Sequence, residues 1–137
     1  MIAIQPYQEA QFAELDALWR TVFPDDPPHS HATVAIPQKL AVQRDLLLVA
    51  QEGDHVLGTI MAGYDGHRGW LYKLAVHPRA RGCGIARALI RAAERALADL
   101  GCTKVNLQVR DTNNDAAAFW AHMGYAVEPR ISMGRQL

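Results

Sequence analysis

Residues Leu74-Ala-Val-His-Pro-Arg-Ala-Arg-Gly-Cys-Gly-Ile-Ala86 form the most informative stretch of this chain. An apolar run ends at Val76, a proline and two glycines follow, and a helical pattern begins at Ile85. We therefore predict a strand, a tight turn and a helix in this order. A glycine-rich turn that enters a helix exposes several backbone N–H groups, and the helix dipole adds about half a positive charge there. Such a turn suits a diphosphate.

The side chains of this turn fit the same interpretation. Gly82 and Gly84 let a diphosphate approach the backbone because neither carries a Cβ, and Arg79 and Arg81 can donate charge-assisted hydrogen bonds to phosphate oxygens. The dinucleotide-binding fingerprint is disfavoured because Arg87 stands where its third glycine belongs, and the Gly-Lys-Ser/Thr of a P-loop is missing. Glycine turns before helices are also common as purely structural features, so the turn alone does not decide the function.

Towards the N-terminus, the pattern predicts a short strand, two helices and then three strands. Apolar residues recur at helical spacing over residues 9–22, and a weaker helix is expected over residues 32–43. Pro37 either kinks this second helix or marks its start. The strands are expected over residues 2–5, 46–52, 55–64 and 70–76.

Towards the C-terminus, we predict a helix over residues 85–100, a buried strand over 104–110 and a short helix over 115–123. Gly124 ends that helix, and two short strands are expected over residues 125–128 and 131–136. The order β-α-α-β-β-β-α-β-α-β-β indicates a mixed α/β, or α+β, arrangement around one sheet. A chain of 137 residues suits a single domain over residues 1–137.

Composition excludes several classes of protein. The 14 basic and 14 acidic side chains balance to a net charge of zero, which argues against binding nucleic acid through a general basic surface. The N-terminus lacks the features of a signal peptide, and no apolar run approaches the roughly 20 residues of a membrane span. We therefore expect a cytoplasmic protein that binds neither membrane nor nucleic acid. Cys83 and Cys102 flank a predicted helix whose ends lie about 25 Å apart, so both thiols should be free.

Two motifs at a suitable separation resemble those of the Gcn5-related N-acetyltransferase (GNAT) superfamily. The stretch from Leu74 to Ala86 resembles its acetyl-CoA loop, Gln/Arg-x-x-Gly-x-Gly/Ala, after a strand that ends in Val-x-Pro. The residues Asn113-x-x-Ala116, Phe119-Trp120 and Met123-Gly-Tyr125 resemble the later motif, Asn-x-x-Ala-x-x-Leu/Phe-Tyr-x-x-x-Gly-Phe/Tyr. Residues 58–69 are similar to the YpeA-like bacterial branch. The similarity covers residues 46–137 well and residues 1–43 only in layout.

This resemblance implies a GNAT fold, with a central, mostly antiparallel sheet splayed between its fourth and fifth strands and about four flanking helices. It also implies that acetyl-CoA is the cosubstrate. Backbone groups of Leu74, Ala75 and Val76 would then pair with the pantetheine arm. Asn113 would contact pantetheine or cap the following helix, and Trp120 would pack near the thiol. The remaining cofactor-binding residues would be those of the turn, namely Arg79, Arg81, Gly82, Cys83, Gly84, Ile85 and Ala86.

The reaction implied is direct transfer of an acetyl group, in a ternary complex, to a primary amine of a small molecule or of a peptide or protein N-terminus. The alternative is a non-catalytic module that binds or senses acyl-CoA. The expected partners are acetyl-CoA and an amine acceptor, with a homodimer allowed. No metal is expected, because His29 and His31 have no further ligands nearby in the sequence. The sequence identifies neither the acceptor nor the acyl-chain preference.

The catalytic positions depart from the pattern of the family. Its ribosomal-protein acetyltransferases use a glutamate on the fifth strand and a tyrosine in the last helix, where this chain has Gln108 and Trp120. A neutral amide is no base, and an indole N–H is no practical acid. We therefore predict His67 as the base with Asp65 orienting it, and Tyr125 as an acid. Each has a structural alternative, which is a hairpin-turn role for Asp65 and a core position for Tyr125.

Overall fold

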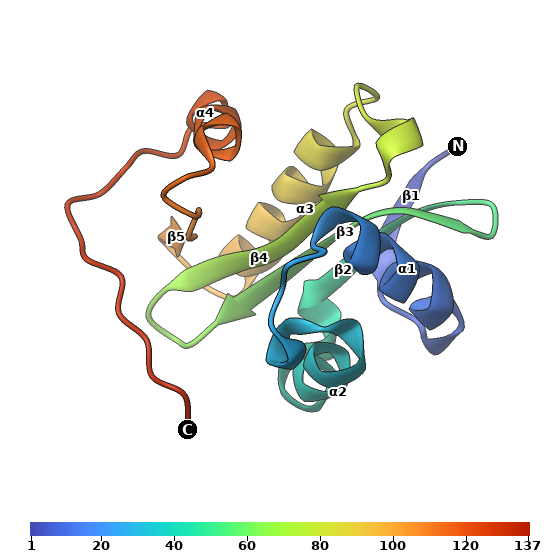
Figure 1. The fold of residues 1–137 in the computed structure, drawn as a ribbon, viewed down its shortest axis with the longest axis horizontal. Helices are drawn as coiled ribbons and strands as arrows, with labels where there is room; N and C mark the ends of the chain where they lie inside the picture. The colour runs from blue at the N-terminus through green and yellow to red at the C-terminus, as the bar shows by residue number, and fades with distance from the viewer. The chain divides into compact units, whose positions relative to one another are not determined.

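The computed structural model describes residues 1–137 and divides into two compact units, residues 1–107 and residues 108–137. The first unit contains the sheet and three α-helices, and the second contains one α-helix followed by chain without regular secondary structure (Figure 1). The expectation of one domain over residues 1–137 stays a prediction. None of the helices has both the length and the apolar character that crossing a bilayer requires.

Five strands form one sheet, and their order across the sheet follows their order in the chain. The first four strands pair antiparallel, and the fifth pairs parallel with the fourth. The strands are β1 (Ala3–Pro6), β2 (Leu47–Glu52), β3 (His55–Tyr64), β4 (Gly69–Val76) and β5 (Val105–Asn106). The sequence predicted the bounds of the first four to within one residue, and the mixed α/β class with a mostly antiparallel sheet is confirmed.

Helices cover both faces of this sheet. In Figure 1, α1 (Phe12–Val22) and α2 (Ala32–Gln43) lie over one face and α3 (Ile85–Asp99) lies over the other. The α2 helix begins at Ala32, so Pro37 lies inside it rather than at its start. The apolar stripe of α3 is buried and consists of Ile85, Leu89, Ile90, Ala93 and Leu97. A separate core under α1 and α2 includes Leu15, Leu18, Trp19, Ile36, Leu47 and Val49.

The sheet opens between β4 and β5. These strands pair only at Gly69 with Val105 and at Trp70 with Asn106, where the Gly69 N–H also donates to the Lys104 carbonyl at 2.9 Å. Beyond this point β4 continues to Val76 with no strand on its outer side. The predicted splay between the fourth and fifth strands is therefore confirmed.

Three predicted strands differ from the structure. The strand expected over residues 104–110 shrinks to Val105–Asn106, and no strand forms over residues 125–128 or 131–136. An alternating apolar pattern makes a strand only when a neighbouring strand supplies hydrogen bonds and packing. Outside Val105–Asn106 these segments have no such ladder, and Val127, Ile131 and Met133 are at least 89% exposed. The predicted short helix does form, as α4 (Asn114–His122).

Strand β3 passes close to both β4 and α3 at Gly58. A Cβ at this position would lie 2.9 Å from the carbonyl oxygen of Ala75, 3.0 Å from Leu89 Cδ1 and 3.1 Å from Ile85 Cγ2. The nearest of these atoms belongs to the backbone of β4, so it cannot rotate away as a side chain could. The absence of a side chain at Gly58 thus allows α3 to sit against the sheet beside the open part of β4.

We expect Gly58→Ala to lower the free energy of unfolding by about 1–3 kcal/mol, because the added methyl group overpacks this contact. The matched control is Gly63→Ala on the same strand, where the nearest atom would lie 3.6 Å away, an ordinary contact distance. Urea unfolding followed by circular dichroism measures both variants. Equal stability of the two would show that the close approach at Gly58 imposes no constraint.

Candidate functional site

The turn between β4 and α3 has an open, concave backbone. It contains a 3₁₀ turn at Pro78–Ala80, and Gly82 and Gly84 adopt left-handed conformations with φ of +82° and +78°. A Cβ on either glycine would meet nothing within 4 Å, so both face open space. Gly84 is the N-cap of α3, which leaves the first N–H groups of the helix pointing out of its end. The predicted strand, turn and helix are confirmed, and the turn fits a diphosphate.

The side chains of this turn leave its open face accessible. Arg79 and Arg81 are exposed and form no ion pair within the protein. Cys83 is an exposed free thiol, and Cys102 is also free, as the sequence predicted. The His77 ring accepts a hydrogen bond from the Arg79 N–H at 3.2 Å and so supports the 3₁₀ turn. Two cationic side chains thus flank the glycine turn and remain available for phosphate oxygens.

Strand β4 carries a bulge directly before the residues expected to hold pantetheine. Tyr72 faces Met61 and Ala75 faces Thr59, so Lys73 and Leu74 share one position of the partner strand. Lys73 has a φ of +54°, which is uncommon for a residue with a side chain. Backbone strain of this kind persists only where surrounding contacts over-determine it.

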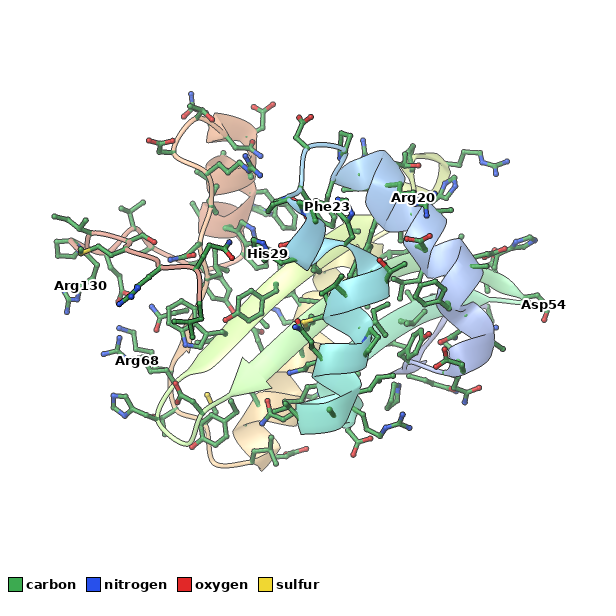
Figure 2. All side chains as sticks on the ribbon, turned by 60° about the horizontal axis from the view of Figure 1, so that its bottom comes forward. Arg20, Phe23, His29, Asp54, Arg68 and Arg130 are labelled. Carbon is green, nitrogen blue, oxygen red and sulfur yellow. The ribbon has the colours of Figure 1, made fainter.

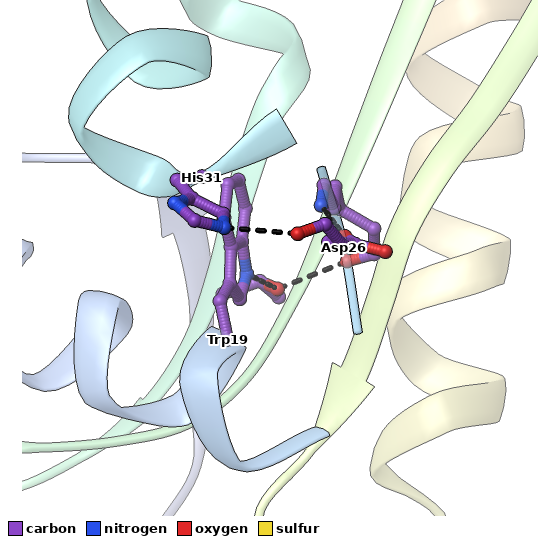
Figure 3. A network of polar contacts seen from close by, with 5 residues as sticks. Trp19, Asp26 and His31 are labelled. Atoms are coloured by element: carbon purple, nitrogen blue, oxygen red, sulfur yellow. Dashed lines mark hydrogen bonds and ion pairs between the residues drawn. The ribbon is translucent and has the colours of Figure 1, made fainter. Parts of the chain in front are cut away.

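Contacts at the backbone carbonyl and at the side-chain ammonium of Lys73 hold the bulge in place (Figure 3). The fully buried Thr59 hydroxyl donates to the Lys73 carbonyl at 3.0 Å and accepts from Trp19 Nε1 at 2.9 Å. At the other end, Lys73 Nζ forms an ion pair with Asp26. The same ammonium lies 4.9 Å from the ring centroid of Trp19 and 4.8 Å from that of Phe23. These contacts join α1, β3, β4 and the loop after α1.

Trp19, Asp26 and Lys73 of this network also line a pocket of about 330 Å³. The Lys73 side chain lies at the pocket, whose walls come from α1, from the loop of residues 23–31 and from the start of α2. Its aromatic residues are Trp19 and Phe23, and its polar residues include Asp26 and His31. His31 Nε2 lies 2.9 Å from the backbone carbonyl oxygen of Asp26. The volume is at the lower end of the range for small-molecule sites.

The sequence did not predict this pocket. Asp26 and Lys73 are 47 residues apart, and Trp19 and Thr59 are 40 apart, so no local pattern connects them. The available signals were weak, namely a threonine within an apolar strand and an aspartate pair in the loop. Tyr72 lies near Lys39 and Gln43 of α2 and is half exposed. Burial, and then the charge of Asp65, raise the pKa of the Tyr72 hydroxyl, which keeps it protonated.

The predicted base and its partner lie in the β3–β4 turn. Asp65 Oδ1 accepts hydrogen bonds from the N–H groups of Arg68 at 2.7 Å and His67 at 2.8 Å, and these bonds hold the pKa of the carboxyl below its usual value. The structural alternative for Asp65, a turn-forming role, is therefore what the structure shows. The turn lies at the opposite end of β4 from the glycine turn (Figure 1), and Arg68 is well separated from Phe23 (Figure 2). The catalytic role of His67 stays a prediction.

The second motif builds α4 and both of its ends. Asn113 Oδ1 accepts from the Ala116 N–H at 3.0 Å, so Asn113 caps the helix. At the other end Gly124 has a φ of +100°, and the Tyr125 N–H donates to the Trp120 carbonyl at 3.0 Å. The rings of Trp120 and Tyr125 pack edge to face at 5.2 Å, which completes a Schellman cap. Tyr125 lies in no strand, and its role as an acid stays a prediction.

Comparisons with known proteins agree on one family. The family model described as "Acetyltransferase (GNAT) family" matches residues 12–125. An acetyltransferase of Yersinia enterocolitica is 36% identical over 137 residues, covering 98% of this chain and 94% of the relative. An uncharacterised N-acetyltransferase of Yersinia pestis has the same identity and coverage.

Solved structures share the fold. Ard1 from Thermoplasma volcanium superposes with a TM-score of 0.83 at 19% identity, covering 93% of this chain and 84% of that one. The aminoglycoside N-acetyltransferase AAC(6')-Iy in complex with CoA gives 0.78 at 20% identity, covering 99% and 95%. At these identities the likeness concerns the fold alone.

We expect Gly82→Val and Gly84→Val each to weaken CoA binding by about tenfold or more, because a branched side chain would occupy the open face of the turn. Both substitutions also strain a left-handed residue. Gly53→Val is the matched control, since Gly53 has a φ of +59° and equally open surroundings in the β2–β3 hairpin. Isothermal titration calorimetry with CoA measures the three variants. Wild-type affinity in both turn variants, with the fold intact, would refute the assignment of the site.

Proposed function

Because the chain belongs to the acetyltransferase (GNAT) family, we propose that it transfers an acetyl group from acetyl-CoA directly to a primary amine. Membership of the family makes it an acetyl-CoA-dependent acyltransferase. The proposed acceptor is a small molecule or a peptide or protein N-terminus. The observation that carries the proposal is the open glycine turn at one end of β4, next to a strand edge that no other strand covers.

The glycine turn and the open strand suit the two parts of the cosubstrate. The backbone N–H groups of residues 81–86 would hold the pyrophosphate, and Arg79 and Arg81 would bind outer phosphate oxygens. The outer backbone groups of Leu74–Val76 would pair with the amides of pantetheine, in place of a neighbouring strand. Acetyl-CoA supplies the activated acetyl group. The pocket in front of Lys73 would receive the acceptor, because it opens at the bulge of the same strand.

The chemistry of the transfer is compatible with Gln108 at the position where the ribosomal-protein acetyltransferases of the family use a glutamate. The amine nitrogen forms a bond to the thioester carbonyl carbon and the C–S bond breaks. The amine proton passes to the base, and CoA leaves as the thiolate, which then takes up a proton. An α-amine, with an ordinary pKa of about 7.7–8.0, costs about 1 kcal/mol to deprotonate at pH 7, whereas a lysine amine costs about 4.6 kcal/mol. Proximity in a ternary complex supplies roughly 7–11 kcal/mol. An acceptor with an α-amine therefore places the smallest demand on a base.

Thiol release with a panel of primary amines tests the proposal. We expect release of free CoA from acetyl-CoA to depend on the amine, with the acetylated amine found by mass spectrometry. Tight CoA binding with no amine-dependent release across the panel would instead favour the alternative, a module that binds or senses acyl-CoA.

A prediction concerns Trp120, which occupies the tyrosine position of the family motif and which we propose packs against acetyl-CoA. We expect Trp120→Phe to keep most of the activity, because phenylalanine preserves an aromatic contact with Tyr125. Trp120→Ala should raise the KM for acetyl-CoA several-fold, since it removes the ring altogether. Steady-state kinetics with varied acetyl-CoA separates the two effects. A large loss of kcat in Trp120→Phe at unchanged KM would argue for a proton-transfer role instead.

Another prediction concerns the proposed base, His67, with Asp65 as its neighbour and Tyr125 as the proposed acid. Histidine ordinarily changes its charge near neutral pH, where general bases are most effective. We expect His67→Ala to lower kcat/KM by about 10²-fold and to flatten the acidic limb of the pH–rate profile. The control is Arg68→Ala in the same turn, which alters the surface charge and leaves the imidazole in place. An unchanged profile in His67→Ala rules the residue out.

A further inference from the structure

Four charged side chains line the pocket, and they form two pairs. Lys73 pairs with Asp26, and Arg20 Nη2 lies 2.7 Å from Asp16 Oδ2. Both carboxylates are shielded, since the Asp16 and Asp26 side chains are only 16% and 19% exposed. Each negative charge of the pocket wall is thus matched by a positive charge at contact distance. The pocket has two acidic residues but no net charge from these four groups.

The ammonium of Lys73 is fixed in this arrangement. Its side chain is 13% exposed, and Nζ lies over the rings of both Trp19 and Phe23 while it contacts Asp26. A carboxylate beside two aromatic faces is a binding position for an ammonium group, and partial burial strengthens the contact with the rings. The backbone of the same residue is held by Thr59. Lys73 thus neutralises Asp26 from a largely buried position that several contacts fix, unlike an exposed surface ion pair.

This arrangement determines which acceptors the pocket favours. An acceptor with several ammonium groups gains from uncompensated carboxylates, and here Lys73 already fills the ammonium position at Asp26. An acceptor with an additional carboxylate finds the Lys73 ammonium already neutralised. An acceptor with one amine and an otherwise neutral, partly apolar body brings no second charge that the pocket would have to pair. Its apolar part contacts the aromatic wall of Trp19 and Phe23.

We propose that Lys73 is a specificity-determining residue: by occupying the ammonium position formed by Asp26, Trp19 and Phe23, it makes the pocket select amines with a single positive charge over polycations and over anionic amines. This inference rests on the proposed function and names the acceptor class. It separates this chain from enzymes for acceptors such as aminoglycosides, which carry several ammonium groups.

Three small α-amino amides provide matched probes, because they share an α-amine and differ in side-chain charge, and mass spectrometry restricts the comparison to the α-acetylated product. Leucinamide is neutral in its side chain, lysinamide is positive, and the α-amide of glutamic acid is negative. The measurement is kcat/KM for thiol release from acetyl-CoA with each probe. We expect wild type to prefer leucinamide over both charged probes.

Two single substitutions should shift this preference in opposite directions. Lys73→Met removes the ammonium from beside Asp26, so the ratio of lysinamide to leucinamide should rise by about tenfold. Asp26→Asn leaves the Lys73 ammonium uncompensated, so the ratio for the glutamic acid amide should rise instead. The double variant, Lys73→Met with Asp26→Asn, should return both ratios towards wild type, and Lys73→Arg should keep them.

The opposite signs separate a role in specificity from a role in structure alone. Damage to the bulge would lower kcat/KM for all three probes alike and leave their ratios unchanged. Unchanged ratios in both single variants, or shifts in the same direction, overturn the inference while thiol release by wild type still supports the proposed function. Absence of thiol release from wild type with every amine overturns the proposed function itself. In that case isothermal titration calorimetry of the three probes with wild type and both single variants tests the charge preference by binding affinity, independently of catalysis.

Discussion

The hydrogen bond from the Thr59 hydroxyl to the Lys73 carbonyl is the contact on which the site depends. Thr59 is the one polar residue among the fully buried side chains, and its hydroxyl is satisfied on both sides, by Trp19 and by Lys73. Fixing the Lys73 carbonyl fixes the bulge. Before the bulge, Tyr72 lies on the face of the sheet that carries Lys39 and Gln43 of α2, and after it Ala75 packs into the core under α1 and α2. A regular strand would place these two residues on opposite faces.

The bulge joins two regions with different physical character. On one side, Leu74–Val76 and the glycine turn present backbone groups and open space, which suit a ligand recognised by its amides and phosphates. On the other side, the pocket presents aromatic rings and compensated charges. In the proposed function the first surface holds the acyl-CoA, and the second discriminates between acceptors. Lys73 belongs to both, because its backbone shapes the strand and its side chain lines the pocket.

Sequence reasoning succeeded where the determinants were local. The glycine turn, the Asn113 cap and the Gly124–Tyr125 cap are each encoded within about ten residues, and the first four strands follow from alternation and turn residues. It failed where the partners are distant in the sequence, as in the ion pair of Asp26 and Lys73, which are 47 residues apart. No local pattern predicts the positive φ of Lys73 either. It predicted strands near the C-terminus that do not form, because an alternating pattern indicates a strand without showing that a partner strand exists. Oδ1 of Asp65 accepts two hydrogen bonds within the turn, and the proposed role of Asp65 beside His67 stays a prediction.

The outer edge of β4, which pairs with no strand beyond Trp70, also bears on how the protein behaves without its cosubstrate. From Leu71 to Val76 no strand pairs with this side of β4, so its backbone groups form a template onto which another chain could add. A ligand that runs along the edge removes the template as it binds. With acetyl-CoA along this edge, as we propose, the cosubstrate protects the edge as well as donating its acetyl group, and we expect CoA-free protein to aggregate more readily during concentration and storage.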